Sequence, residues 1–202
     1  MYRYVKRLLD IVLSLAAVVG LSWLIVIIAL AVKIEDGGNI FFKQKRIGKG
    51  KKEFYIYKFR TMKTSTPKDV PTHLLTDPDS YITAIGKFLR KSSLDELPQL
   101  FNILRGEMSV VGPRPALWNQ YDLIAERDRY GANDITPGLT GWAQVNGRDE
   151  LPIDVKAAYD GEYVKKRSFL FDVYIIVKTV SSVFKAEGVR EGRNEDNTHR
   201  KE

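Results

Sequence analysis

The hydrophobic pattern divides the chain into a long apolar segment near its start and a mixed remainder. Residues 11–32 carry no charge, and as a helix they are long enough to cross a hydrocarbon core of about 30 Å. A signal peptide usually has a shorter apolar region that ends at a small-residue cleavage site, and no such site precedes residues 33–36. We therefore predict a retained, membrane-inserted helix within residues 1–36.

Two topologies are open for this helix. Basic residues flank both of its ends, with Arg3, Lys6 and Arg7 before it and a richer set of lysines and arginines after it. The positive-inside rule keeps both flanks in the cytoplasm, and a re-entrant helix that returns to the same face satisfies it. A plain span would instead leave the N-terminus outside. Gly20 and Ser22, near the middle of the segment, favour a bend, and we favour the re-entrant topology.

Short strands and helices are predicted after this segment. Two apolar-rich runs, residues 40–44 and 54–59, flank a basic Gly-Lys turn and predict two strands, and residues 108–111 predict a third. The polar, proline-containing stretch 63–80 predicts a loop. Apolar residues at helical spacing predict helices over residues 82–91, 95–105, 117–130, 153–166 and 169–186, of which the last is amphipathic.

These elements predict an α/β fold. The expected organisation is an N-terminal membrane helix over residues 1–36, a cytosolic domain over residues 37–188 with surface helices at the membrane interface, and a charged flexible tail over residues 189–202.

The composition restricts the chemistry. The chain has no cysteine and only two histidines, which excludes disulfides, cysteine zinc sites and thiol nucleophiles and argues against a Ser-His-Asp triad. Carboxylates, arginines and lysines remain. Lysine and arginine number 32 against 25 acidic residues, so the formal net charge is +7. An anionic partner is expected, and nucleic acid, anionic lipid and a sugar nucleotide all qualify.

The adjacent carboxylates Asp95 and Glu96 have two interpretations. Ser93 and Glu96 fit a capping box at the start of a helix. Alternatively, adjacent carboxylates near several arginines divide the work of a phosphoryl transfer: one attacks phosphorus, and the other binds Mg²⁺. In that case nearby cations would keep the attacking carboxylate ionised.

Three basic segments are candidates for anion binding. Arg114 lies between Pro113 and Pro115, in a stiff loop suited to bidentate phosphate binding or, equally, to a turn that pairs with a local acid. Lys58 and Arg60 alternate with Phe59, so they share one strand face, either at a site or simply exposed. The glycine-rich stretch 136–148 ends in Arg148 and has a composition suited to a loop closing over a ligand.

Together these motifs resemble the bacterial sugar transferases, the small monotopic phosphoglycosyl transferases that start glycan assembly on polyprenyl phosphate. The resemblance extends from the apolar segment to about residue 188. It is carried by FFKQKRIG at 41–48, YKFRTM at 57–62, LDELPQ at 94–99, GPRP at 112–115 and PGLTGWAQVNGR at 137–148.

The resemblance implies a ping-pong reaction. A UDP-sugar gives its sugar phosphate to an aspartate and releases UMP, and polyprenyl phosphate then takes the sugar phosphate. By motif, Asp95 would be the nucleophile and Glu96 the Mg²⁺ ligand. The other implied residues are Arg90 and Arg114 for phosphate oxygens, Lys58 and Arg60 in the same anionic site, Arg148 near the nucleotide or sugar, and Asp160 and Asp172 as supporting carboxylates.

The resemblance also implies a setting. The enzyme would lie at the cytoplasmic face of the inner membrane, with an N-acetylated amino sugar on its donor and downstream glycosyltransferases as partners. The family's re-entrant helix bends at a Ser-Pro pair, whereas here Ser22 precedes Trp23. Ser22 can still help a bend through a hydrogen bond to a carbonyl one turn back. The rival interpretation is a non-catalytic, membrane-anchored module that binds anionic lipid. The membrane segment argues against a nucleic-acid partner.

Overall fold

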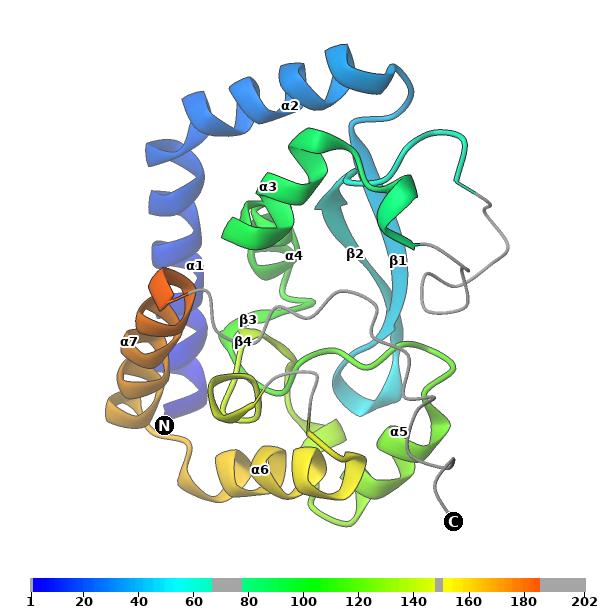
Figure 1. Ribbon diagram of the computed structural model, residues 1–202. Coiled ribbons are helices and arrows are strands. Elements are labelled where there is room, and N and C mark those ends of the chain that lie inside the picture. Colours follow the sequence, from blue (N-terminus) through cyan, green and yellow to red (C-terminus); the bar gives the residue numbers. More distant parts are fainter. Residues whose placement is uncertain (1, 67–77, 148–150, 186–202) are drawn as a thin grey trace, which may run out of the picture.

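The computed structural model describes residues 2–66, 78–147 and 151–185 (Figure 1). Arg148 and the tail 189–202 lie outside the described residues, as does most of the predicted loop 63–80. The fold mixes helices with two small sheets, which agrees with the mixed class predicted. Its helices are α1 Tyr2–Gly20, α2 Ser22–Asp36, α3 Ala84–Ser92, α4 Gln99–Arg105, α5 Tyr121–Asp128, α6 Ile153–Lys166 and α7 Phe169–Lys185. Its strands are β1 Phe41–Ile47, β2 Glu53–Phe59, β3 Ser109–Val111 and β4 Gly138–Thr140.

The apolar N-terminal segment forms a bent pair of helices. The break between α1 and α2 lies at Leu21, and the bend is 63°. Ser22 Oγ donates to the carbonyl of Val19 at 2.8 Å, which is the predicted hydrogen bond one turn back. Among the described residues no single helix is long and apolar enough to cross a membrane, whereas α1 and α2 together meet that criterion by length and composition.

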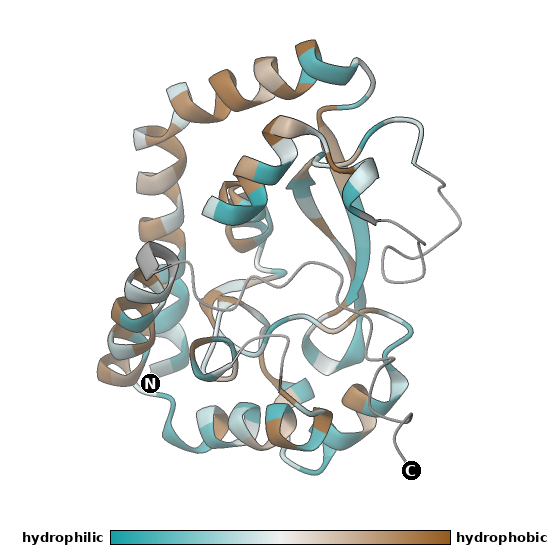
Figure 2. Ribbon diagram, viewed as in Figure 1, coloured by the Kyte–Doolittle hydropathy of each residue, from teal (hydrophilic) through white to brown (hydrophobic). Residues whose placement is uncertain are grey.

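One face of α1 packs against the rest of the molecule, and the other is apolar and exposed. Asp10 and Ser14 are buried on the inner face, while Leu8 and Val19 are more than half exposed on the outer one. Figure 2 shows apolar residues along much of α1 and α2. The inner face contacts α4 and β3. This distribution is the reverse of an ordinary surface helix, whose polar face is the exposed one.

A β-hairpin forms the larger of the two sheets. β1 and β2 are antiparallel, with Phe41 opposite Phe59, and confirm the two strands predicted from the apolar runs. Phe59 is buried, as its alternation with Lys58 predicts, and packs against Ile28 of α2 and Leu89 of α3. The second helix of the bent pair is therefore part of a core cluster.

The second sheet consists of the short parallel pair β3 and β4. The chain leaves β3 directly into Gly112–Pro115, where Gly112 lies against β4: a Cβ at Gly112 would lie 2.8 Å from the backbone nitrogen of Gly138. Only glycine fits this close approach of two backbones. The pair therefore fixes the start of the loop that carries Arg114.

Two predicted helices are shorter than expected. The helix predicted over 95–105 begins only at Gln99, because Ser93 is left-handed and the chain then forms a short 3₁₀ turn, Leu94–Glu96, before Pro98. The helix predicted over 117–130 begins at Tyr121. Leu117 forms a β-bridge with Arg46 and so does not belong to the helix.

Candidate active site

Asp95 and Glu96 lie on the 3₁₀ turn between α3 and α4. Ser93 ends α3 in the left-handed region, with φ of 57°, and reverses the chain into this turn. The Ser93 side chain makes no capping hydrogen bond, so the capping-box interpretation is wrong. Leu94 and Leu97 pack against the core cluster around Phe59 and Leu89. The turn is thus held by its leucines, and Asp95 is itself buried.

Two cations from separate elements meet at Glu96. Lys58, on β2, places Nζ 2.7 Å from Glu96 Oε1 and 3.6 Å from Asp95 Oδ2. Arg114, on the loop after β3, places Nη2 3.2 Å from the same Glu96 oxygen. The side chains of Lys58, Asp95 and Glu96 are less than one-fifth exposed, and that of Arg114 is 32% exposed. The structure therefore joins three of the sequence motifs into one cluster of two acids and two bases.

The two carboxylates have opposite pKa shifts. Burial by itself would raise the pKa of Glu96. The positive charges of Arg114 and Lys58 outweigh burial, so the pKa is lowered to about 2. Burial also raises the pKa of Asp95, and the charge of Glu96 adds to the increase. Here the pull of Lys58 and the arginines is too weak to reverse it. The cations were expected to keep Asp95 ionised; they do lower its pKa, but by less than burial raises it, and Lys58 lies closer to Glu96 than to Asp95.

Arg90 and Arg60 lie in different surroundings. Arg90, in the last turn of α3, donates from Nε to Thr61 Oγ1 at 2.8 Å, and its charge is close enough to act on the pKa of Asp95. Arg60 follows the end of β2 and donates to the carbonyl of Gly37 at 2.6 Å, where α2 ends. The structure brings Arg90 and Lys58 to the acidic pair and places Arg60 at the end of α2.

Asp160 and Asp172 each have a buried network of their own. Asp160 on α6 forms an ion pair with Arg127 of α5, 2.6 Å from Nη2, and both side chains are almost fully buried. Asp172 on α7 accepts hydrogen bonds from Tyr2, Lys6 and Tyr163, at 2.6 to 2.8 Å. Within the structure these carboxylates join helices.

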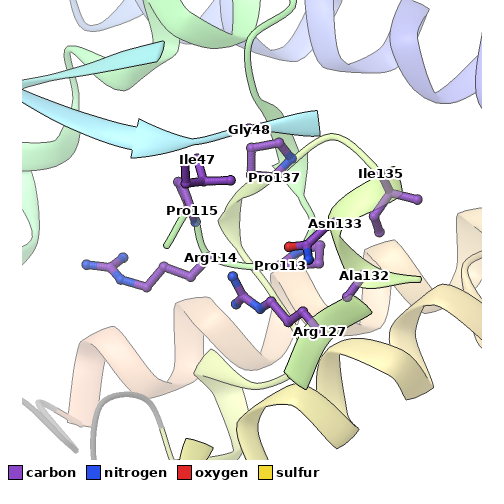
Figure 3. Close-up of a pocket in the computed structure, with 10 residues that line it drawn as sticks. All are labelled: Ile47, Gly48, Pro113, Arg114, Pro115, Arg127, Ala132, Asn133, Ile135 and Pro137. Atoms are coloured by element: carbon purple, nitrogen blue, oxygen red, sulfur yellow. The ribbon is translucent and has the colours of Figure 1, made fainter. Parts of the chain in front are cut away.

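Arg127 was not anticipated from the sequence. Figure 3 shows it with Arg114 among the residues that line a small cavity beside the Gly112–Pro115 loop, together with Gly48 and Asn133. Nothing in its local motif marks Arg127, because its acidic partner lies on another helix. Sequence patterns reveal partners within one helix at spacings of three or four residues, and this pair is 33 residues apart.

Asp95 and Glu96 are a candidate donor set for a divalent ion among the described residues. No group of three or more histidine, aspartate or glutamate side chains in the described ranges is placed to hold a metal. Magnesium needs fewer protein ligands, because it usually binds one or two carboxylates together with substrate phosphates and water. Asp95 and Glu96 supply two adjacent carboxylates, which fits an ion that arrives with a diphosphate.

Comparison with known proteins identifies the family. The family model described as "Bacterial sugar transferase" matches residues 1–186. The chain belongs to the bacterial sugar transferases. This agrees with the resemblance found in the motifs, and the match includes both the bent helix pair and the site at Asp95 and Glu96.

Several relatives of this sugar transferase carry descriptive names. A "UDP-glucose:undecaprenyl-phosphate glucose-1-phosphate transferase" of Xanthomonas campestris pv. campestris is 42% identical over 88% of this chain and 38% of its own length. An "Uncharacterized sugar transferase EpsL" of Bacillus subtilis is 39% identical over 92% of this chain and 90% of its own. A "UDP-N-acetylgalactosamine-undecaprenyl-phosphate N-acetylgalactosaminephosphotransferase" of Aeromonas hydrophila is 36% identical over 94% of this chain and 46% of its own. This chain therefore spans less than half the length of the Xanthomonas and Aeromonas relatives.

Proposed function

We propose that this sugar transferase moves a sugar 1-phosphate from a UDP-sugar to polyprenyl phosphate by way of a covalent intermediate on Asp95. The observation that carries the proposal is the convergence of Lys58 and Arg114 on the adjacent carboxylates Asp95 and Glu96. A phosphoryl transfer asks mainly for positioning and charge neutralisation. Two fixed cations beside a carboxylate nucleophile meet both needs.

In the first step, Asp95 attacks the sugar-bearing phosphorus of the donor. The new bond joins a carboxylate oxygen of Asp95 to this phosphorus, while the bond from phosphorus to the bridging oxygen breaks and UMP leaves with the electron pair. Asp95 attacks in its ionised form, and the charges of Lys58, Arg90 and Arg114 favour that form. Arg114 and Lys58 neutralise charge on the phosphate oxygens, and Arg90 and Arg148 are the further candidates for this role.

In the second step, an oxygen of polyprenyl phosphate attacks the same phosphorus and frees Asp95. The product is a polyprenyl diphosphate sugar, and the resting enzyme is restored. Glu96 is ionised throughout the neutral range because its pKa is about 2, so it is the carboxylate suited to hold Mg²⁺. When bound with the diphosphate, the ion supplies further charge neutralisation.

We further propose that α1 and α2 form a re-entrant membrane helix at the cytoplasmic face of the inner membrane. The 63° bend and the exposed apolar residues of both helices support this placement, as do the basic flanks on either side. Trp23 takes the position after Ser22 where the family has proline, and Ser22 supports the bend through its bond to Val19. A polyprenyl phosphate whose tail stays in the bilayer then meets Asp95 at the surface.

The donor sugar is proposed to be an N-acetylated amino sugar, and the lipid product to pass to downstream glycosyltransferases. The relatives support a UDP-sugar donor and an undecaprenyl phosphate acceptor, but their names differ in the sugar: glucose in one and N-acetylgalactosamine in another. Both donors therefore belong in the test.

UMP release measures the first step directly. Detergent-solubilised protein with Mg²⁺ is incubated with a panel of UDP-sugars, with and without polyprenyl phosphate, beside the variants Asp95→Asn and Glu96→Gln. The proposal predicts one equivalent of UMP without acceptor, continued turnover with it, and no UMP from Asp95→Asn. If no donor releases UMP while the protein still binds anionic vesicles, the non-catalytic lipid-binding module is the better description.

A further inference from the structure

A carboxylate on the N-terminal helix holds the strand that precedes Arg114. Asp10 of α1 is 5% exposed. Its Oδ2 accepts a hydrogen bond from Ser109 Oγ at 2.8 Å, and its Oδ1 accepts one from the backbone N–H of Val110 at 3.0 Å. Ser109 and Val110 belong to β3. An aspartate in an apolar helix therefore has two partners on one strand about 100 residues away.

Asp10 accepts a backbone hydrogen bond from the outer edge of β3, where a neighbouring strand would otherwise accept it. β3 pairs with β4 on one edge, where the N–H of Ser109 donates to the carbonyl of Pro137 at 2.8 Å. Successive N–H groups of a strand point to opposite edges. The N–H of Val110 therefore faces away from β4, and a buried N–H without a partner is costly. The carboxylate of Asp10 satisfies this donor and fixes the outer edge of a strand only three residues long.

The position of β3 passes to Arg114 through a stiff connection. Gly112 is pressed against β4, and prolines on both sides of Arg114 fix their own φ angles. Few soft backbone torsions remain between β3 and Arg114, whose guanidinium lies 3.2 Å from Glu96. A displacement of β3 is therefore expected to displace Arg114.

The same helix also contacts the other side of the site. Arg7, on α1, donates to the carbonyls of Ile103 and Leu104 at 2.5 and 2.9 Å. These carbonyls lie at the end of α4, the helix that follows Asp95 and Glu96. α1 is thus attached both to the element after the acidic pair and to the strand before Arg114.

We propose that Asp10 is a positioning residue for the transfer reaction: it acts through β3 to set the place of Arg114 relative to Glu96. The inference rests on the proposed function for its kinetic consequences, whereas the structural coupling does not depend on it. In this account the membrane helix is part of the frame of the active site as well as an anchor.

Three variants on the inner face of α1 separate this role from general damage. Asp10→Ala removes both hydrogen bonds. Asp10→Asn keeps the shape: its amide oxygen accepts from Val110, and its amide nitrogen donates to Ser109. Ser14→Ala is the matched control, because Ser14 is equally buried on the same face but its hydroxyl makes no hydrogen bond within the described residues.

The kinetic test is a double-mutant cycle with Arg114→Ala. Asp10→Ala is expected to lower kcat/KM for the donor roughly 10- to 100-fold, the cost of a misplaced group. Asp10→Asn and Ser14→Ala are expected to stay within about threefold of the native value, because both keep an acceptor for the N–H of Val110. A difference of that size is close to the precision with which the effects of independent sites add. In the Arg114→Ala background, the loss from Asp10→Ala should nearly disappear. An equal loss in both backgrounds would overturn the proposal, as would an unchanged kcat/KM for Asp10→Ala.

Hydrogen exchange tests the coupling without activity. The amides of residues 108–117 should exchange faster in Asp10→Ala than in the native chain, Asp10→Asn or Ser14→Ala, and unchanged exchange would overturn the proposal. If Asp10→Ala does not fold, Ser109→Ala removes one of the two bonds and takes its place in the cycle. If the native chain releases no UMP with any donor, the proposed function fails, and the exchange result alone decides whether Asp10 positions β3.

Discussion

At the scale of single residues, the site depends on how two cations are shared between two acids. Lys58 and Arg114 lie 2.7 and 3.2 Å from Glu96, whereas Lys58 lies 3.6 Å from Asp95. Burial is the largest influence on both carboxyl groups. At Glu96 the nearby cations outweigh burial, so this candidate metal ligand has a lowered pKa and stays ionised. At Asp95 burial outweighs the cations, so the pKa of this candidate nucleophile is raised.

The low pKa of Glu96 predicts a pH-dependent stability. An unfolded glutamate titrates near 4.5, and the folded one near 2. The stabilisation is therefore complete above the unfolded pKa and is lost as the pH falls towards 2. The shift corresponds to about 3 kcal/mol. In metal-free buffer, the unfolding free energy should fall by about that much more in the native chain than in Glu96→Gln between pH 5 and pH 2. Parallel pH profiles by tryptophan fluorescence would contradict the cation contacts described.

The buried pair of Asp160 and Arg127 predicts a large stability effect. Asp160→Ala leaves Arg127 buried without its carboxylate, which costs about 3–5 kcal/mol in comparable cases. Arg129→Ala is the control, because its ion pair with Glu126 is on the surface and such pairs contribute about 1 kcal/mol or less. Thermal unfolding in detergent measures both. Equal shifts in Tm would show that Asp160 has no special structural role.

At the scale of elements, alternation and turn signals were sufficient for the hairpin and for the burial of Phe59. The same signals did not predict where individual helices and strands begin and end. Arg60 lies just past the end of β2, so alternation no longer fixes its direction, and it turns to the end of α2 instead of joining Lys58. The predicted helix over 95–105 breaks because Ser93 adopts a left-handed conformation that no local pattern requires.

The inner face of α1 was also missed, although its signal is in the sequence. Lys6, Asp10 and Ser14 recur every four residues, the spacing of one helical face. The basic residues were interpreted only as a membrane flank, whereas Lys6 binds Asp172 and Arg7 binds the end of α4. Long-range partners of this kind depend on the tertiary fold, which periodicity within one element cannot supply.

The re-entrant topology predicts that both ends of the bent helix pair lie on the cytoplasmic side of the membrane. The chain has no cysteine, so single cysteines at Tyr4 and at Lys49 can be labelled specifically. In the re-entrant topology a membrane-impermeant maleimide labels neither site in intact spheroplasts and both after lysis. Labelling of Tyr4→Cys from outside would instead establish a span. Lys49→Cys, in the turn of the β-hairpin, is the internal control for the cytoplasmic side.

At the scale of the whole molecule, the apolar N-terminal helices and the rest of the chain form one structure. Ile28 and Val32 of α2 share a core cluster with Phe59 and Leu89, and α1 supplies Asp10 to β3. The sequence division at residue 36 therefore separates regions of different polarity but not separate cores.

Removal of the N-terminal helices is predicted to abolish folding, not merely membrane binding. A chain without residues 1–36 exposes the partners of Ile28 and Val32 and leaves Val110 without its acceptor, so it should aggregate or show no cooperative unfolding. Removal of residues 189–202, the charged tail, is the control and should leave Tm and UMP release unchanged. A soluble, cooperatively folded 37–202 fragment would contradict the shared core.

The proposed mechanism depends on a covalent phosphosugar on Asp95, and an intact-mass measurement detects this intermediate. The native protein is mixed with Mg²⁺ and an active UDP-sugar in the absence of polyprenyl phosphate, quenched, and compared with Asp95→Asn. The native chain should gain the mass of one sugar phosphate, peptide mapping should place it on Asp95, added polyprenyl phosphate should remove it, and Asp95→Asn should gain nothing. Turnover of donor to product without such an adduct, or an adduct that persists in Asp95→Asn, would rule out a covalent intermediate on Asp95.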